Sequence, residues 1–203
     1  MPTLDIENSI WDEGYDYIAF CDEVGRGCLF GSVLAAAVIM PKGLFIEGIR
    51  DSKKLSPKKR EQLYEIIKKE CIAMGVGMVS SKIIDKINIK NATKLAMKKA
   101  IMSIKDKDEN NIVPDYILVD AEEIELSIPQ MAIIKGDDSS HGIAASSIVA
   151  KVLRDRLCER WDMKYPGYNI KQNKGYGTKE HREALRQYGA SPMHRKTFLS
   201  KIL

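Results

Sequence analysis

The amino-acid sequence predicts an α/β fold, with a β-sheet flanked by α-helices and a helical C-terminal part that begins at about residue 140. Short apolar runs alternate with helix-like segments after a strand-rich start. From about residue 140 onward, apolar residues recur at helical spacing. No internal repeat, low-complexity tract or linker interrupts the 203 residues, so we expect one domain that spans residues 1–203.

The composition is typical of a globular protein. Hydrophobic residues make up 44% and charged residues 30% of the chain, and no apolar stretch is long enough to span a bilayer. The N-terminus lacks the basic start and apolar run of a secretory signal, so we expect a cytoplasmic protein. The four cysteines form no Cys-x-x-Cys pair and are expected to be reduced core residues. The net charge of +4 permits a polyanionic partner without requiring one.

In the first half of the chain, turn and cap signals mark the expected elements. Gly25-Arg26-Gly27 is interpreted as a turn between two strands. Ser56 is expected to be the N-cap of a helix that has Pro57 at its first position and ends near residues 74–75. The remaining expected elements up to residue 111 are strands over 17–22, 32–40 and 76–80, a helix over 91–104 and an exposed loop over 105–111.

The second half of the chain contains two short apolar runs, 115–120 and 131–134, which we interpret as buried strands. A long helix is expected from about residue 140 to about Trp161, because its apolar residues fall on one side of a helix. The last expected helix covers 179–188, with Thr178 as its N-cap.

Carboxylates stand at or just beyond the ends of three expected strands, and they are the main chemical signal in the sequence. They are Asp22 with Glu23, Asp120, and Asp137 with Asp138. Ligands of open α/β sheets usually sit beyond strand ends, so these acids can converge. At about 5 Å and an effective dielectric of about 20, each ionised pair would repel by roughly 3 kcal/mol, which a divalent cation would reverse. Oxygen-only ligands favour magnesium or manganese over zinc.

Each of these acids also has a simpler interpretation. An Asp at a strand end often forms a turn, and Asp137 or Asp138 could cap the following helix. Adjacent strand residues point to opposite faces, so Asp22 and Glu23 can both face one metal only if the strand ends or bulges there. The glycines at 25 and 27 are compatible with such a break.

Basic residues concentrate in two segments, 53–60 and 171–196. Such segments are commonly solvated faces, although they also suit phosphate binding. Lys53 and Lys54 are candidate phosphate contacts from the first segment.

The stretch Asp22-Glu23-Val24-Gly25-Arg26-Gly27 resembles the signature of the type 2 ribonuclease H family, which is ribonuclease HII in bacteria. The resemblance continues in order along nearly the whole chain. Its further motifs are Asp51-Ser52-Lys53-Lys54-Leu55-Ser56, Ile84-Asp85-Lys86-Ile87-Asn88-Ile89, Val119-Asp120, Lys135-Gly136-Asp137, Ala144-Ala145-Ser146-Ser147-Ile148-Val149-Ala150-Lys151-Val152 and Gly175-Tyr176-Gly177-Thr178.

The resemblance implies a ribonuclease H-like mixed sheet flanked by helices, and an enzyme that is usually monomeric. Asp22, Glu23, Asp120 and Asp137 match the family's four catalytic, metal-binding carboxylates. The implied reaction uses two ions, Mn²⁺ or Mg²⁺, and leaves a 5′-phosphate and a 3′-hydroxyl. The implied substrates are RNA/DNA hybrids and duplex DNA with a single embedded ribonucleotide, cut on its 5′ side. Such an enzyme must sense one 2′-hydroxyl.

The resemblance also implies residues that bind the substrate. Gly25, Arg26 and Gly27 match the family loop at the junction between ribonucleotide and deoxyribonucleotide, where glycine permits close approach to the sugar. Tyr176 matches the tyrosine that packs on the following sugar, and Lys53 is a candidate phosphate contact. Without the family, the glycines could form an ordinary tight turn and the tyrosine could simply anchor a loop.

Several positions depart from the family pattern. Cys28 and Ser32 stand where proline is common, Phe30 stands where a small residue is common, and Ala121 follows the third acid. None replaces a catalytic carboxylate. Without proline at positions 28 and 32 the loop beside Gly27 is expected to be looser, and Phe30 is expected to add bulk there, so we expect substrate preference to be affected more than activity. His141 could assist proton transfer or merely occupy a helix start, and we favour the helix start.

Two other interpretations are compatible with the acids and the basic surface. One is a catalytically silent nucleic-acid-binding module that uses its acids structurally. The other is a different metal-dependent nuclease on the same fold, such as a resolvase or an integrase core. The Gly-Arg-Gly loop and Tyr176 disfavour the second interpretation.

Overall fold

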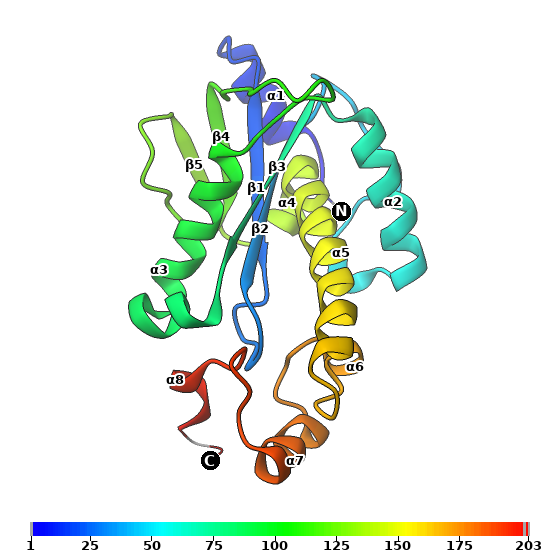
Figure 1. Ribbon diagram of the computed structural model, residues 1–203. Coiled ribbons are helices and arrows are strands. Elements are labelled where there is room, and N and C mark those ends of the chain that lie inside the picture. The colour runs from blue at the N-terminus through cyan, green and yellow to red at the C-terminus, as the bar shows by residue number, and fades with distance from the viewer. Residues whose placement is uncertain (1, 201, 203) are drawn as a thin grey trace.

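The computed structural model describes residues 2–200 and 202 and shows a mixed five-stranded β-sheet with helices on both faces (Figure 1). The strand order is β3-β2-β1-β4-β5. β2 is antiparallel to both β1 and β3, whereas β4 is parallel to both β1 and β5. The strands are β1 (Ile18–Val24), β2 (Val33–Ile39), β3 (Ala73–Val79), β4 (Tyr116–Asp120) and β5 (Gln130–Ile133). The expected α/β class is confirmed.

Two long helices sandwich the sheet, and β1 supplies side chains to the core on each side. α5 (His141–Lys164) packs on the face that contains Phe20, and α3 (Ser81–Met102) packs on the face that contains Cys21. This alternation follows from the two-residue period of a strand. The other helices are α1 (Asp5–Asp12), α2 (Pro57–Glu70), α4 (Gly136–Ser139), α6 (Ile170–Asn173), α7 (Lys179–Tyr188), α8 (Lys196–Leu199) and the 3-10 turn η1 (Ser52–Lys54).

Most of the expected elements are confirmed. Strands occupy the expected ranges 17–22, 32–40 and 115–120 to within two residues. Ser56 and Thr178 are the N-caps of α2 and α7. Each hydroxyl oxygen accepts a hydrogen bond from the backbone N–H three residues later in the chain, at 3.3 Å in both cases. The four cysteines are free and buried, as expected.

The boundary between α2 and β3 differs from the prediction. The helix ends at Glu70 instead of residues 74–75, and the strand begins at Ala73 instead of residue 76. Gly75 was expected at the end of the helix, but it lies in the strand, where buried Gly75 and Gly77 alternate with more exposed residues. A Cβ atom on either glycine would overlap a backbone carbonyl of α3. The glycines therefore let α3 lie close against the sheet.

Two other predictions were incomplete. The helix expected from residue 91 is preceded by a helical segment from Ser81, and the two are joined at a kink where Asn88 has φ of 65°. Asn88 Oδ1 accepts the N–H of Asn91 at 3.1 Å and so starts the second segment. β5 was expected to be buried, but it is an edge strand in which Met131 is 43% exposed.

The N-terminal helix α1 was not predicted. It places the buried Glu7 carboxylate against the start of α5, where Oε1 accepts hydrogen bonds from Ser140 Oγ at 2.8 Å and from the Gly142 N–H at 2.9 Å. A carboxylate at this point also complements the positive end of the α5 dipole. α1 therefore fixes the junction between α4 and α5. Asp137 lies in α4, just before this junction.

After Ser140, every described secondary-structure element is a helix, and the β1–β2 hairpin reaches down to this helical part (Figure 1). Phe30, from the hairpin, is completely buried there and contacts the rings of Trp161, Tyr165 and His194. The expectation that its bulk would lie at the substrate loop is wrong, because the side chain fills this separate core. Within residues 2–200, no helix is long and apolar enough to cross a membrane.

We predict that Gly77→Ala lowers the free energy of unfolding by about 1–3 kcal/mol, because the new methyl group must push α3 away from β3. The matched control is Val76→Ala on the exposed face of the same strand, which should change the free energy much less. Urea denaturation would measure both. Equal losses in the two variants would contradict the close approach of α3.

Candidate active site

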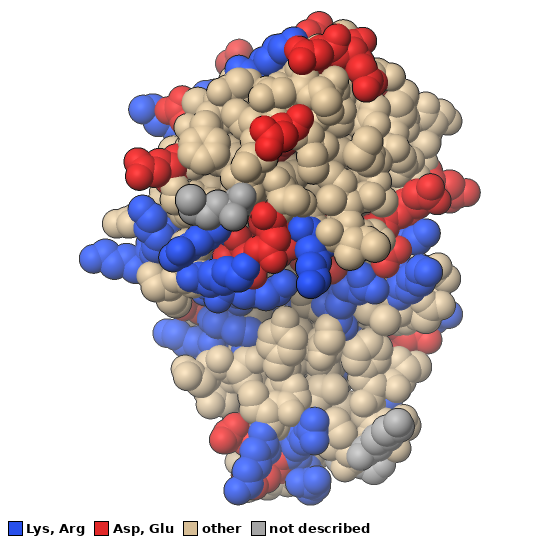
Figure 2. Space-filling view, turned by 180° about the vertical axis from the view of Figure 1, so that it is seen from behind, with Lys and Arg blue, Asp and Glu red and all other residues tan. Residues whose placement is uncertain are grey.

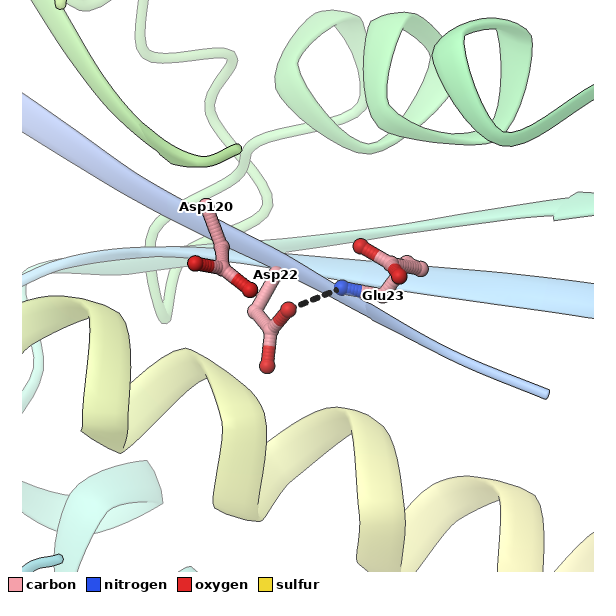
Figure 3. Close-up of side chains that lie close together, drawn as sticks. All are labelled: Asp22, Glu23 and Asp120. Carbon is pink, nitrogen blue, oxygen red and sulfur yellow. Dashed lines mark hydrogen bonds between the residues drawn. The ribbon is translucent and has the colours of Figure 1, made fainter. Parts of the chain in front are cut away.

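The strand order brings three carboxylates together at the C-terminal ends of β1 and β4. The parallel register pairs Cys21 with Val119, so the next residues, Asp22 and Asp120, lie side by side. Glu23 completes the group, and one oxygen from each of the three residues lies within 4.8 Å of the others. Figure 3 shows the three side chains at the edge of the sheet above α5.

The geometry explains how two adjacent strand residues can serve one site. The ladder between β1 and β2 continues without a bulge to Val24, but the ladder between β1 and β4 stops at Cys21. Beyond that point β4 no longer pairs with β1, so side chains from both faces of β1 can reach the same space. Asp22 bends toward its neighbour, and its Oδ1 accepts the backbone N–H of Glu23 at 2.7 Å (Figure 3).

Burial and mutual repulsion make this carboxylate group hard to ionise. Burial raises the pKa of Asp22 well above its usual value, and the charges of Glu23 and Asp120 raise it further. Burial also raises the pKa of Glu23 to about 7, although the nearby Arg26 opposes the shift. Among the residues that the structure describes, the buried Glu23 Oε2 has no hydrogen-bond partner. An unpartnered oxygen within a carboxylate cluster suits a divalent cation, which would relieve the repulsion.

The fourth predicted acid, Asp137, lies next to this group but is not part of it. Its Oδ2 is 3.7 Å from Lys53 Nζ, and burial raises its pKa while Lys53 opposes the shift. The two acid positions are connected through Gly136, whose backbone N–H donates to Asp120 Oδ1 at 2.7 Å. The neighbouring Asp138 points to Lys54 instead. The structure therefore brings three of the four predicted acids together, whereas the fourth, Asp137, forms an ion pair with Lys53.

The Gly25-Arg26-Gly27 turn lies between the acids and Tyr176. Gly25 has φ of +92°, in the region that favours glycine, and a Cβ there would lie 2.6 Å from Arg154 Cζ. Arg26 Nη1 is 3.2 Å from Glu122 Oε1 and 3.6 Å from Glu23 Oε1. On the other side, a Cβ on Gly27 would lie 3.9 Å from Tyr176 Cε1, and the tyrosine is 45% exposed.

Comparison with known proteins places this arrangement in a family. The family model for ribonuclease HII matches residues 20–201. The chain is 73% identical to the ribonuclease HII of Alkaliphilus oremlandii and 68% identical to that of Alkaliphilus metalliredigens, over the full length of all three chains. Its fold is similar to the crystal structure of the ribonuclease H2 from Pyrococcus horikoshii OT3, with a TM-score of 0.74 at 26% identity, over 92% of this chain and 96% of that one.

The chain belongs to the ribonuclease HII family. It is a hydrolytic nuclease with ribonuclease H activity on RNA/DNA, and its sheet is the ribonuclease H-like fold that the sequence implied. The interpretation as a catalytically silent module and the interpretation as a resolvase or integrase core are set aside by this membership.

Sequence analysis missed three buried charged residues of this ribonuclease HII site. Glu122 follows Asp120 by two residues and pairs with Arg26. Arg154 and Arg195 are completely buried and donate to backbone carbonyls of the 25–32 loop. In the sequence, both arginines lie among basic residues that resemble a solvated surface, so only their contacts identify them.

All three histidines of the chain are buried, and two of them support Tyr176. Tyr176 O accepts from His181 Nδ1 at 2.8 Å, and Ser191 N–H donates to His194 Nδ1 at 2.9 Å. These two bonds fix the tautomers, so His194 Nε2 donates to His181 Nε2 across 3.1 Å. His141 is the first residue of α5 and accepts the Ile46 N–H, which agrees with the helix-start interpretation.

We predict that the three buried histidines contribute less to the stability of the protein as the pH falls from about 6.5 toward 4. Burial lowers the pKa of His141 and of His194 to about 4, and it lowers the pKa of His181 as well. The unfolded chain binds these protons at about pH 6.5, so the contribution of the histidines is full above that pH and declines below it, by about 1–2 kcal/mol per histidine. The raised pKa values of Asp22 and Glu23 change stability in the opposite direction over the same range.

Urea denaturation at a series of pH values would measure this decline, and His194→Asn should make it shallower. The same dependence on pH in the wild type and in His194→Asn would contradict the neutral histidine pair, because the carboxylates are identical in the two proteins.

Proposed function

We propose that this ribonuclease also cuts duplex DNA on the 5′ side of a single embedded ribonucleotide, and that it leaves a 5′-phosphate and a 3′-hydroxyl. The observation that carries the proposal is the position of the Gly25-Arg26-Gly27 turn, which lies between the convergent carboxylates and the half-exposed ring of Tyr176. A turn of this kind can approach one sugar closely while the acids lie beside the adjoining phosphate. Recognition of a single ribonucleotide requires close contact with one sugar, because only one 2′-hydroxyl distinguishes it from DNA.

We assign the metal-binding and catalytic role to Asp22, Glu23, Asp120 and Asp137. The first three offer oxygen ligands at one point, and Asp137 can join them by leaving Lys53. The all-oxygen donor set favours Mn²⁺ or Mg²⁺. Two such ions, when bound, would supply an activated water and stabilise the leaving 3′ oxygen.

The remaining residues bind the duplex in this proposal. Gly25 and Gly27 allow the backbone to approach the ribose, Arg26 contacts phosphate, and Tyr176 packs on the sugar that follows. Lys53 is 80% exposed at its side chain and lies beside Asp137, so it can contact a phosphate near the reacting one. Figure 2 shows that lysine and arginine side chains gather in a band across one face, which suits a polyanionic duplex. We propose that the protein acts as a monomer in the cytoplasm.

We predict that Asp120→Asn lowers the rate of cleavage by at least about a hundredfold, because it removes a charged ligand from the acidic group. The matched control is Asp138→Asn, an exposed acid near the site that pairs with Lys54 and should leave the rate within about twofold.

The assay would use three labelled duplexes: an RNA/DNA hybrid, a DNA duplex with one ribonucleotide, and an all-DNA duplex. Metal-dependent cleavage 5′ of the ribonucleotide, with the all-DNA duplex left intact, is the expected result. Cleavage of the hybrid alone would refute the proposal for single ribonucleotides.

We also predict that Asp22→Asn stabilises the protein in the absence of divalent ions. The folded state raises the pKa of Asp22, so ionisation of this carboxylate opposes folding at neutral pH, whereas Asn cannot ionise and keeps an acceptor for the Glu23 N–H. A gain of about 1 kcal/mol would raise the melting temperature by about 2–4 °C.

Manganese should raise the melting temperature of the wild type and have little effect on Asp22→Asn. Differential scanning fluorimetry with and without Mn²⁺ would measure both shifts. An Asp22→Asn variant that is less stable than the metal-free wild type would contradict the electrostatic account.

A further inference from the structure

The buried side chain of Arg195 contacts the Gly25-Arg26-Gly27 turn from the interior of the protein. Its guanidinium donates from Nη2 to the Gly25 carbonyl and from Nη1 to the Arg26 carbonyl, at 2.7 Å in both cases. Its Nε donates to the Gly31 carbonyl at 3.0 Å, and the side chain is completely buried. Among the described residues, no carboxylate forms an ion pair with it. At short range the charge is therefore stabilised by carbonyl dipoles of the loop itself, and Asp85 adds a longer-range attraction.

These bonds determine which way the amides of the turn face. In a trans peptide, the carbonyl of one residue and the N–H of the next point in opposite directions. Because the Gly25 and Arg26 carbonyls point inward to Arg195, the N–H groups of Arg26 and Gly27 point outward. Within the described part of the chain, neither of these two N–H groups has an acceptor. They face the side on which the substrate is proposed to lie.

The segment that carries Arg195 is itself anchored by α3. Asp85 accepts the backbone N–H groups of Lys196 and Thr197 at 2.9 and 3.0 Å, and it accepts the Thr197 hydroxyl at 2.6 Å. The Arg195 backbone N–H donates to the Leu29 carbonyl at 2.9 Å. Asp85 belongs to a sequence motif that the acidic site does not use, and this contact gives it a structural task.

Arg154 provides an internal comparison. It is equally buried and also donates to backbone carbonyls, but these belong to Phe30, Ser32 and Lys174, beyond the turn. It packs beneath Gly25 without donating to it. Two similar arginines therefore hold different parts of one loop. Arg195 alone of the two donates to carbonyls of the turn, where the Gly25 carbonyl also accepts the Cys28 N–H at a longer 3.5 Å.

We propose that Arg195, anchored through Asp85, is a positioning residue for ribonucleotide recognition, because it turns the Arg26 and Gly27 amides toward the sugar. The inference rests on the proposed function, since it assumes that the turn reads a ribose. A lysine at 195 keeps the charge but cannot direct donors to three separate carbonyls, so it should release the turn.

The test compares the binding of two duplexes that differ only in one ribonucleotide. Each variant is made in an Asp120→Asn background to prevent cleavage, and fluorescence anisotropy in Mg²⁺ gives the ratio of the two dissociation constants. Arg195→Lys should reduce the preference for the ribonucleotide duplex about tenfold, while its affinity for the all-DNA duplex stays within about twofold. Arg154→Lys should reduce the preference less, because the carbonyls of the turn stay bonded to Arg195.

A second variant covers the case in which Arg195→Lys does not fold. Asp85→Ala changes a partly exposed residue and should reduce the preference about threefold, because it loosens the segment that carries Arg195. An unchanged preference in folded Arg195→Lys or Asp85→Ala, or an equal loss in Arg154→Lys, would overturn the inference. If the background protein itself shows no preference, the assignment of the substrate fails together with the inference, which distinguishes the two failures.

Discussion

The structure depends on the parallel pairing of β1 with β4, which places Asp22 beside Asp120 in a buried position. Two carboxylates at this distance repel each other, and burial makes the repulsion stronger than it would be in water. The fold can tolerate this arrangement because α3 and α5 cover opposite faces of β1 with apolar residues and hold the strand in place. The stability of the sheet is therefore what keeps an unfavourable acidic group together, and in the proposed function a divalent cation would relieve the repulsion within that group.

The proposed recognition of the substrate depends on a different part of the chain. The β1–β2 hairpin leaves the sheet and enters the helical C-terminal part, where Phe30 is buried. There, buried polar side chains donate hydrogen bonds to the backbone. Arg154 and Arg195 donate to carbonyls of the loop, and His181 donates to the Tyr176 carbonyl. Such contacts fix backbone directions more firmly than apolar packing alone, because each carbonyl has a defined donor. The acids and the turn are adjacent, yet they are positioned by separate interactions.

The sequence allowed much of the fold and part of the site to be predicted. Apolar runs that end in carboxylates identified β1 and β4 together with their acids, because a buried strand leaves few other places for charge. The position of Asp137 on Lys53 could not be predicted, since it depends on the turn into α4. The burial of Arg195 could not be predicted either, because a basic segment in a sequence does not show which side chain points inward. Gly75 was misinterpreted for a related reason: glycine ends helices, but it also admits a neighbouring helix.

The most direct test of this account is anomalous diffraction from a crystal of the protein soaked in Mn²⁺, with data collected at the manganese absorption edge. The account predicts an anomalous peak between the carboxylates of Asp22, Glu23 and Asp120, where their oxygens converge within 4.8 Å. It also predicts that Asp137 turns from Lys53 toward the ion. Manganese peaks at other carboxylates of the protein, with none among these three, would contradict the claim that the β1–β4 pairing builds a metal centre.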